Sequence, residues 1–162
     1  MGEVNAQNGM IRHLVDEKSD TFISYINNYR YDLNDGMEIL WMSERDGWRH
    51  LYRIDGKTGE VKNQITRGEW VVRKVIFVDA GQQRIYFMAS GLNKKEDPYN
   101  QHYCCVNFDG TGFQDLTPEN ANHKVILSKD RSYFVDVYSR PDLPPVSVLR
   151  KLGEKKVIAT LE

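Results

Sequence analysis

The sequence predicts an all-β fold made of about three four-stranded antiparallel blades of a β-propeller. Its apolar residues come in short runs between turn residues, and no apolar stripe of helical period crosses these runs. The outline of the first unit also recurs about 46 residues later, which is typical of propeller blades. Because a closed propeller has about four to eight blades, we expect a chain of 162 residues to form only part of one.

The first complete blade is predicted at about residues 20–66. We expect an opening segment at 20–31 and then strands at 38–43, 50–55 and 61–66. The turns between these strands carry the Asp and Gly residues that tight chain reversals favour. Alternating apolar and polar side chains at 50–55 indicate a strand rather than a helix.

Two further blades are predicted at about residues 70–117 and 123–162. Their expected strands are 70–78, 84–91, 102–107, 113–117, 123–128, 132–139, 146–150 and 156–161. A proline-bearing loop is expected at 139–145, inside the last blade. Residues 1–19 would end a preceding blade, so we interpret the whole chain, 1–162, as a single partial propeller domain.

Composition and charge exclude several classes of function. A net charge of −1 offers no basic surface for nucleic acid, so no nucleic-acid partner is expected. No run of about 18 apolar residues predicts a membrane-spanning helix. The first nine residues lack the apolar segment of a signal peptide.

The cysteines and histidines point to structure rather than to chemistry. Cys104 and Cys105 are adjacent, so on a strand their side chains face opposite ways, and we expect one buried and one half-exposed thiol. No cluster has the spacing of metal ligands, and no cofactor or metal is expected. His50 and His102 occupy matching positions in two blades, which predicts a shared structural hydrogen bond.

One motif carries a family resemblance. The segment Ser43-Glu44-Arg45-Asp46-Gly47-Trp48-Arg49-His50-Leu51-Tyr52 resembles the blade motif of the dipeptidyl peptidase IV N-terminal domain, a β-propeller in the prolyl oligopeptidase class of serine peptidases. Residues 65–72 are similar to that family's Thr-x-Gly-x-Trp passage into the next blade, and residues 139–145 resemble its proline-bearing loop. The resemblance covers residues 16–162.

The resemblance implies a two-part enzyme whose catalytic residues lie elsewhere. In the family, the propeller caps a C-terminal α/β-hydrolase domain with a Ser-His-Asp triad and a Gly-x-Ser-x-Gly elbow. This chain has no such pentapeptide, and it also lacks the Glu-Glu pair with which the family grips a substrate's amino terminus. We therefore assign no catalytic residue here. The implied role is to gate substrate access and to help shape the peptide-binding pocket. The alternative is a non-catalytic propeller that serves as a protein-binding or ligand-binding scaffold.

The resemblance also suggests a substrate contact. In the family, the loop that leads into this blade faces the cavity between propeller and hydrolase, and here that loop is residues 26–31. Asn28, Tyr29 and Arg30 are therefore the candidate substrate-binding residues, because they offer hydrogen-bond donors and flat contact area to a peptide. The alternative is a solvated loop with one packed tyrosine.

The expected partners follow from the same reasoning. The resemblance implies the parent's C-terminal hydrolase domain and a peptide substrate, and family analogy implies export to the periplasm or the cell surface. A partial propeller would also expose blade faces and open strand edges. Such edges pair with other strands, so we expect self-association through the end blades.

Overall fold

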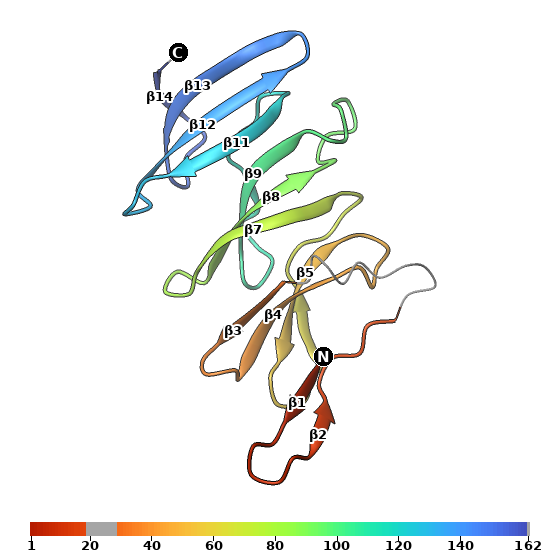
Figure 1. Ribbon diagram of the computed structural model, residues 1–162. Coiled ribbons are helices and arrows are strands. Elements are labelled where there is room, and N and C mark those ends of the chain that lie inside the picture. The colour runs from red at the N-terminus through yellow and green to blue at the C-terminus, as the bar shows by residue number, and fades with distance from the viewer. Residues whose placement is uncertain (19–28, 162) are drawn as a thin grey trace. The chain divides into compact units, whose positions relative to one another are not determined.

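The computed structural model describes residues 1–18 and 29–161, and within these ranges every regular element is a β-strand. The strands form three four-stranded antiparallel sheets and one two-stranded hairpin (Figure 1). This arrangement confirms the predicted all-β fold class. Among the described residues, no helix is long and apolar enough to cross a membrane.

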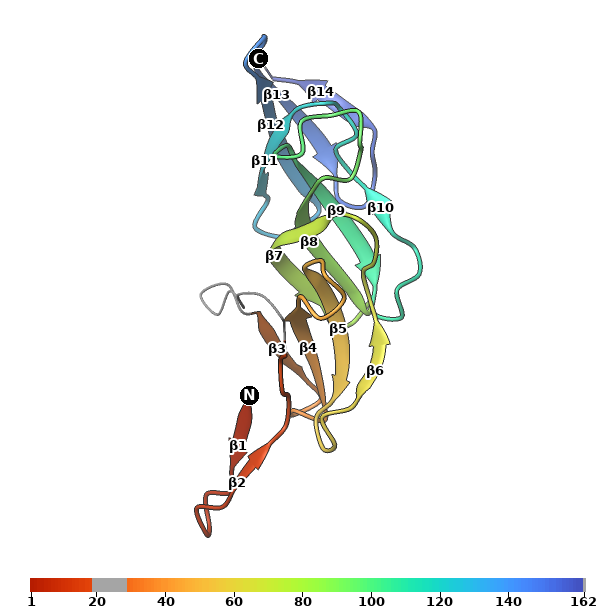
Figure 2. The same ribbon diagram turned by 90° about the vertical axis from the view of Figure 1, so that its right-hand side faces the viewer.

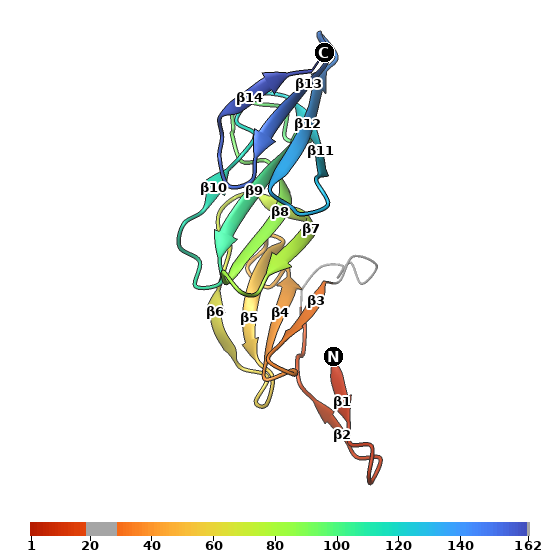
Figure 3. The ribbon, with the colours of Figure 1, turned by 90° about the vertical axis from the view of Figure 1, so that its left-hand side faces the viewer.

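The first four-stranded sheet is a simple meander. It consists of β3 (Arg30–Leu33), β4 (Glu38–Ser43), β5 (His50–Asp55) and β6 (Val61–Gln64), which lie side by side in chain order (Figure 3). Trp41 of β4 pairs with Tyr52 of β5, and all six residues of β4 are buried. The hairpin of β1 (Gly2–Val4) and β2 (Ile11–His13) precedes this sheet.

The β5–β6 turn needs a glycine. A Cβ on Gly56 would lie 1.7 Å from the carbonyl oxygen of Gly36, so no other residue fits there without moving the backbone. Asp55 supports the same turn, because its Oδ1 accepts the amides of Lys57 and Thr58. The predicted Asx chemistry therefore holds this turn in place.

Two further meanders follow. The second sheet consists of β7 (Val71–Asp79), β8 (Arg84–Ser90), β9 (Gln101–Asn107) and β10 (Gln114–Asp115). The third consists of β11 (Asn122–Leu127), β12 (Tyr133–Arg140), β13 (Leu143–Lys151) and β14 (Val157–Thr160). Figure 2 shows the last strands β6 and β10 at the edges of their sheets, beside β5 and β9.

The chain divides into two compact units. The first comprises Met1–Gly68 together with Phe108–Gly110, and the second comprises Glu69–Asn107 and the chain from Thr111 onward. Each unit has its own apolar cluster. In the first, Trp41, Tyr52 and Ile54 pack with Leu14 and Val15. The cluster of the second consists of Tyr86, Met88, Tyr103, Cys105, Leu116 and Phe134. Whether the chain is a single domain stays a prediction.

Two sequence-based expectations are wrong in detail. The predicted proline-bearing loop is only a tight turn, since β12 ends at Arg140 and β13 begins at Leu143. Pro144 and Pro145 therefore lie in β13. The pairing of β12 with β13 is irregular nearby, between Tyr138 and Arg140, and prolines, which have no amide proton to donate, are tolerated at such irregularities of a sheet.

The cysteines also differ from expectation. Cys104 and Cys105 are both fully buried, because the central strand β9 is covered on both faces along residues 102–106. Burial raises the pKa of each thiol, which keeps both protonated and unreactive.

The shared histidine position is built around a threonine. In the first blade, the amide of Leu51 donates to Thr66 Oγ1 at 2.9 Å, and Thr66 Oγ1 lies 3.0 Å from Nδ1 of His50. The second blade repeats this bond, since the amide of Tyr103, next to His102, donates to Thr117 Oγ1 at 2.8 Å. All of these groups are buried. Each threonine thus satisfies a backbone donor that water does not reach.

We predict that replacing Thr66 by valine destabilises the chain. Valine keeps the shape but leaves the buried amide of Leu51 without its acceptor, which costs about 1–3 kcal/mol. The free energy of unfolding, from urea titration, measures this cost. The exposed Thr58→Val is the matched control, with an expected change within about 0.5 kcal/mol. Equal effects of the two substitutions would contradict a special role for Thr66.

Candidate functional site

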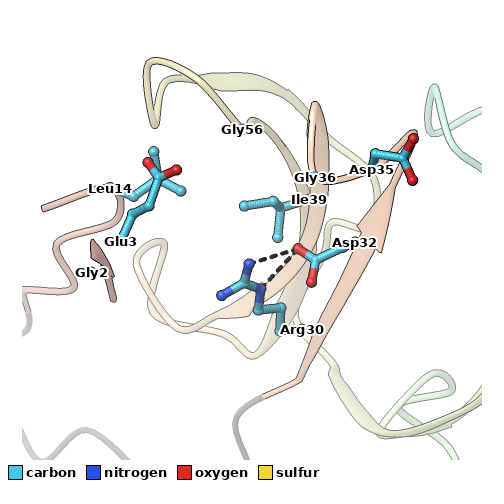
Figure 4. A pocket seen from close by; sticks show the side chains of 9 residues that line it. All are labelled: Gly2, Glu3, Leu14, Arg30, Asp32, Asp35, Gly36, Ile39 and Gly56. Carbon is cyan, nitrogen blue, oxygen red and sulfur yellow. Dashed lines mark hydrogen bonds and ion pairs between the residues drawn. The ribbon is translucent and has the colours of Figure 1, made fainter. Parts of the chain in front are cut away.

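A cavity of about 550 Å³ lies in the first unit and contains one of the predicted substrate residues, Arg30 (Figure 4). Its volume falls within the range of small-ligand sites. The lining residues come from the β1–β2 hairpin, from β3 and β4, and from two tight turns. They are Gly2, Glu3, Leu14, Arg30, Asp32, Asp35, Gly36, Ile39 and Gly56.

The charged groups of this cavity are largely paired. Nε and Nη2 of Arg30 both lie 2.9 Å from Oδ1 of Asp32. Glu3, on the opposite wall, pairs with Arg12. The carboxylate of Asp35 points away from Arg30 in Figure 4. Both side chains of the Arg30–Asp32 pair are 45% exposed, so water screens their attraction and leaves them able to exchange partners.

The chemistry that this lining allows is binding. None of the nine lining residues is a serine, threonine, cysteine, histidine or lysine, so the cavity wall offers no hydroxyl, thiol or amine nucleophile and no imidazole base. Arg30 offers hydrogen-bond donors to a carbonyl or a carboxylate, and Asp32 accepts from an amide or an amine. Leu14 and Ile39 supply an apolar wall.

The structure places two of the three predicted residues, and their environments differ. Arg30 lines the cavity, but it belongs to β3 and pairs with Trp41, so this end of the expected loop 26–31 is a strand. Tyr29 is half-buried, and its carbonyl accepts the amide of Met42 at 3.1 Å. Burial, and then the neighbouring Tyr31, raise the pKa of Tyr29 to about 12. Asn28 lies outside the described residues. The substrate contact itself stays a prediction.

Glu17 forms a hydrogen-bonding centre beside β4 that the sequence did not reveal. Its carboxylate accepts Trp41 Nε1 at 2.7 Å, Ser43 Oγ at 2.6 Å and Arg45 Nη2 at 2.6 Å. The Arg45 guanidinium also lies over the Tyr52 ring, 4.9 Å from its centroid. These donors come from residues 24 to 28 positions away, so no local motif could have indicated the cluster.

The matching histidines differ in protonation. Nδ1 of His50 lies 3.0 Å from the Thr66 hydroxyl, which can donate a hydrogen bond to it. Nε2 lies 2.9 Å from the Gly68 carbonyl, which can only accept one. Burial lowers the pKa of His50, and the Gly68 carbonyl and Asp46 only partly oppose this. A neutral imidazole therefore fits the first blade.

His102 is surrounded by acceptors instead. Nδ1 lies 2.8 Å from the Thr117 carbonyl and 3.3 Å from Asp115, and Nε2 lies 3.0 Å from Glu96. Burial lowers the pKa of His102, but Asp115, the Thr117 carbonyl and Glu96 together outweigh it and raise the pKa to about 9. An imidazolium therefore fits the second blade.

A buried ionic network lies next to His102. The ring of His123 contacts that of His102, with centroids 5.2 Å apart, and Nδ1 of His123 lies 2.9 Å from Asp136. Arg150, 1% exposed, donates to Asp136 at 3.2 Å and to Glu119 at 2.6 Å. The sequence did not predict this network, because its charged pairs join residues 13 to 31 positions apart.

Glu119, His123 and Asp136 lie close enough to hold a metal ion, but their bonds do not suit one. Nδ1 of His123 lies 2.9 Å from Asp136 and Nε2 lies 2.8 Å from the Glu119 carbonyl, so both ring nitrogens are already engaged within the protein. Arg150 already supplies the positive charge between the two carboxylates. The group is therefore a structural ionic network.

Comparison with known proteins decides the family. The family described as "Dipeptidyl peptidase IV (DPP IV) N-terminal region" matches residues 3–145. The chain belongs to this family. The predicted resemblance is thereby confirmed, and the dipeptidyl peptidase IV blade motif at 43–52 spans the end of β4, a turn and the first half of β5.

Relatives and solved structures agree with this membership. Dipeptidyl peptidase 4 of Arthroderma otae is 25% identical over 161 residues, which cover 98% of this chain and 19% of that protein. The probable dipeptidyl peptidase 4 of Emericella nidulans is 26% identical over 127 residues, covering 75% and 16%. The chain thus spans about a fifth of the length of the first of these dipeptidyl peptidase IV relatives.

A solved dipeptidyl peptidase 4 from Porphyromonas gingivalis shares the fold. The TM-score is 0.74 at 20% identity, over 99% of this chain and 22% of that one. A putative dipeptidyl aminopeptidase IV from Bacteroides ovatus has a TM-score of 0.65 at 22% identity, over 82% and 21%. At these identities the likeness to dipeptidyl peptidase IV structures concerns the fold alone.

We predict that stability depends on pH through His102. Its pKa is raised in the fold from 6.5 to about 9, so its contribution is complete below pH 6.5 and is lost as the pH rises through 9. That contribution is on the order of 2 kcal/mol. Denaturant unfolding of the wild type and of His102→Gln at pH 6.5, 7.5 and 9 should give a difference that shrinks as the pH rises.

The matched control is His50→Gln. Because the pKa of His50 is lowered in the fold, its titration acts below pH 6.5 and not above it. Thiols and other groups that titrate near pH 9 cancel in each wild-type-minus-variant difference. A difference for His102→Gln that stays constant across the range would refute the imidazolium assignment.

Proposed function

We propose that the chain is the β-propeller segment of a dipeptidyl peptidase IV-like serine exopeptidase, with the catalytic hydrolase domain outside residues 1–162. The observation that carries this proposal is the family match over residues 3–145, together with relatives about five times as long. The proposed role of the segment is to gate substrate access and to help shape the peptide-binding pocket.

The cavity at Arg30 supports a binding role. The Arg30–Asp32 pair is half-exposed, which suits a surface that exchanges an internal ion pair for contacts with a peptide. The protonated phenol of Tyr29 would add a donor and flat contact area one residue away. The parent's hydrolase domain and a peptide substrate are the partners that this role requires. Export to the periplasm or the cell surface belongs to the same proposal.

The first test asks where the chemistry resides. We expect residues 1–162 alone to release no nitroaniline from a dipeptidyl-nitroanilide, because the chain has no nucleophile elbow. We expect the full-length gene product to release it, and its sequence beyond residue 162 to contain Gly-x-Ser-x-Gly. An inhibitor-sensitive activity of the short chain would contradict the proposal. A gene product without a hydrolase domain would favour the scaffold alternative instead.

The second test concerns Arg30 in the full-length enzyme. We expect Arg30→Gln to raise KM severalfold with little change in kcat, because a lost substrate contact weakens binding without touching the reacting groups. The exposed Arg73→Gln is the matched control and should leave both constants unchanged. An unchanged KM for Arg30→Gln would remove Arg30 from the proposed pocket.

Self-association of the isolated chain completes the proposal. Ile126 of β11 and Ile158 of β14 are 57% and 51% exposed, on the two outermost strands of the third sheet. Apolar side chains on open edges favour pairing with a second copy. Sedimentation should show dimers or larger species that Ile158→Lys reduces, and a monomer at all concentrations would contradict this part.

A further inference from the structure

A second cavity, of about 370 Å³, lies in the second unit, apart from the site at Arg30. It is formed by the ends of β7 and β8, the β11–β12 turn and the turn that follows β13. Two arginines, one lysine and two aromatic rings contribute to its wall. These residues are Arg84, Arg131, Lys151, Phe77 and Tyr86.

Arg84 has an unused hydrogen-bond donor at this cavity. Its Nε is buried and has no hydrogen-bond partner among the residues that the structure describes. Its Nη1 lies near the turn after β13, 3.9 Å from the point where a Cβ on Gly153 would stand. Within the same described residues, Arg84 forms no ion pair with a carboxylate. A buried guanidinium donor without an acceptor is unusual, and a ligand oxygen is the kind of acceptor that it needs.

Arg131 brings a second guanidinium to the cavity. Its side chain is exposed, and its backbone has φ of 58°, which residues other than Gly, Asn and Asp rarely adopt. The guanidinium lies over the Phe77 ring, 4.7 Å from the centroid. Phe77 in turn stacks on Tyr86, with centroids 4.4 Å apart and an interplanar angle of 11°. Cation–π contact positions Arg131 but leaves its charge unneutralised.

The carboxylates of the cavity are engaged with other groups. Asp79 Oδ1 accepts the amide of Gln82 at 3.0 Å. Asp130 Oδ1 accepts the Ser128 hydroxyl at 2.6 Å and the amide of Ser132 at 3.1 Å, and these bonds lower the pKa of Asp130 to about 2. Lys151 pairs with Glu154 at 2.9 Å. None of these contacts involves Arg84 or Arg131, so the Nε of Arg84 and the guanidinium of Arg131 keep donors that are available to an anion, while Arg84 also forms a hydrogen bond with Tyr86.

We propose that this cavity binds a small organic carboxylate. The guanidiniums of Arg84 and Arg131 would donate to its two oxygens, since planar guanidinium forks match carboxylate geometry. The half-buried Phe77, whose two faces are taken by Arg131 and Tyr86, would contact the apolar body of the ligand through its ring edge. The cavity volume of about 370 Å³ fits such a molecule. This site is independent of the proposed peptidase role.

The experiment is a titration of the 162-residue chain with benzoate, followed by calorimetry and by amide NMR shifts. We expect saturable binding with shifts at the β7–β8 and β11–β12 turns. Benzyl alcohol, which has the same ring without the charge, should not bind there. Arg131→Gln and Arg84→Gln should each weaken binding roughly tenfold or more, because each removes a charged hydrogen bond.

Two controls keep the result decisive. Arg73→Gln removes an exposed arginine from the same sheet, outside the cavity, and should bind benzoate as the wild type does. Arg131 is exposed, so its variant should fold even where Arg84→Gln does not. Absence of saturation, or equal weakening by Arg73→Gln, would overturn the proposal. Equal binding of inorganic phosphate with the same sensitivity to Arg131→Gln would also overturn it, because the site would then recognise any oxyanion.

Discussion

The first two blades depend on one recurrent hydrogen bond, from an amide near the start of a buried inner strand to a threonine hydroxyl just after the neighbouring edge strand. Leu51 of β5 donates to Thr66, which follows β6, and Tyr103 of β9 donates to Thr117, which follows β10. Strands β5 and β9 are buried almost throughout, so water does not reach these amides. Without the threonine acceptor, each of these two blades would bury an unpaired amide.

In both blades a histidine precedes the amide that donates to the threonine. The other groups around that histidine differ between the two blades. In the first blade the Thr66 hydroxyl and the Gly68 carbonyl suit a neutral ring. In the second, Asp115 and Glu96 convert the equivalent ring into a cation, which then lies beside the ionic network of His123, Asp136 and Arg150. An equivalent position in a repeat therefore fixes geometry but not protonation, because the acceptors around the histidine differ between the two blades.

The contrast between features that repeat along the chain and contacts that do not explains what could be predicted from the sequence. The strands were predictable because alternation and Asp-Gly turns are local signals, and their recurrence at a spacing of about 46 residues reinforced each one. The burial of both cysteines, the placement of Pro144 and the strand position of Arg30 were not predictable, since each depends on what covers a strand or on a register shift. The Glu17 cluster and the Arg150 network could not be predicted from the sequence either. Their partners are distant along the chain, and a single sequence carries no record of such pairings.

Membership in the dipeptidyl peptidase IV N-terminal region family and the character of the cavities lead to the same division of labour. The cavity at Arg30 has no serine, cysteine or histidine in its wall, so it holds none of the groups of a serine-type site. His50, His102 and His123 each contact two or more carbonyl, carboxylate or hydroxyl oxygens, and these contacts hold the buried rings in place. The half-exposed Arg30–Asp32 pair offers recognition instead. These features fit the proposed division of labour, in which the propeller segment positions a ligand and a hydrolase domain of the parent would supply the reacting groups.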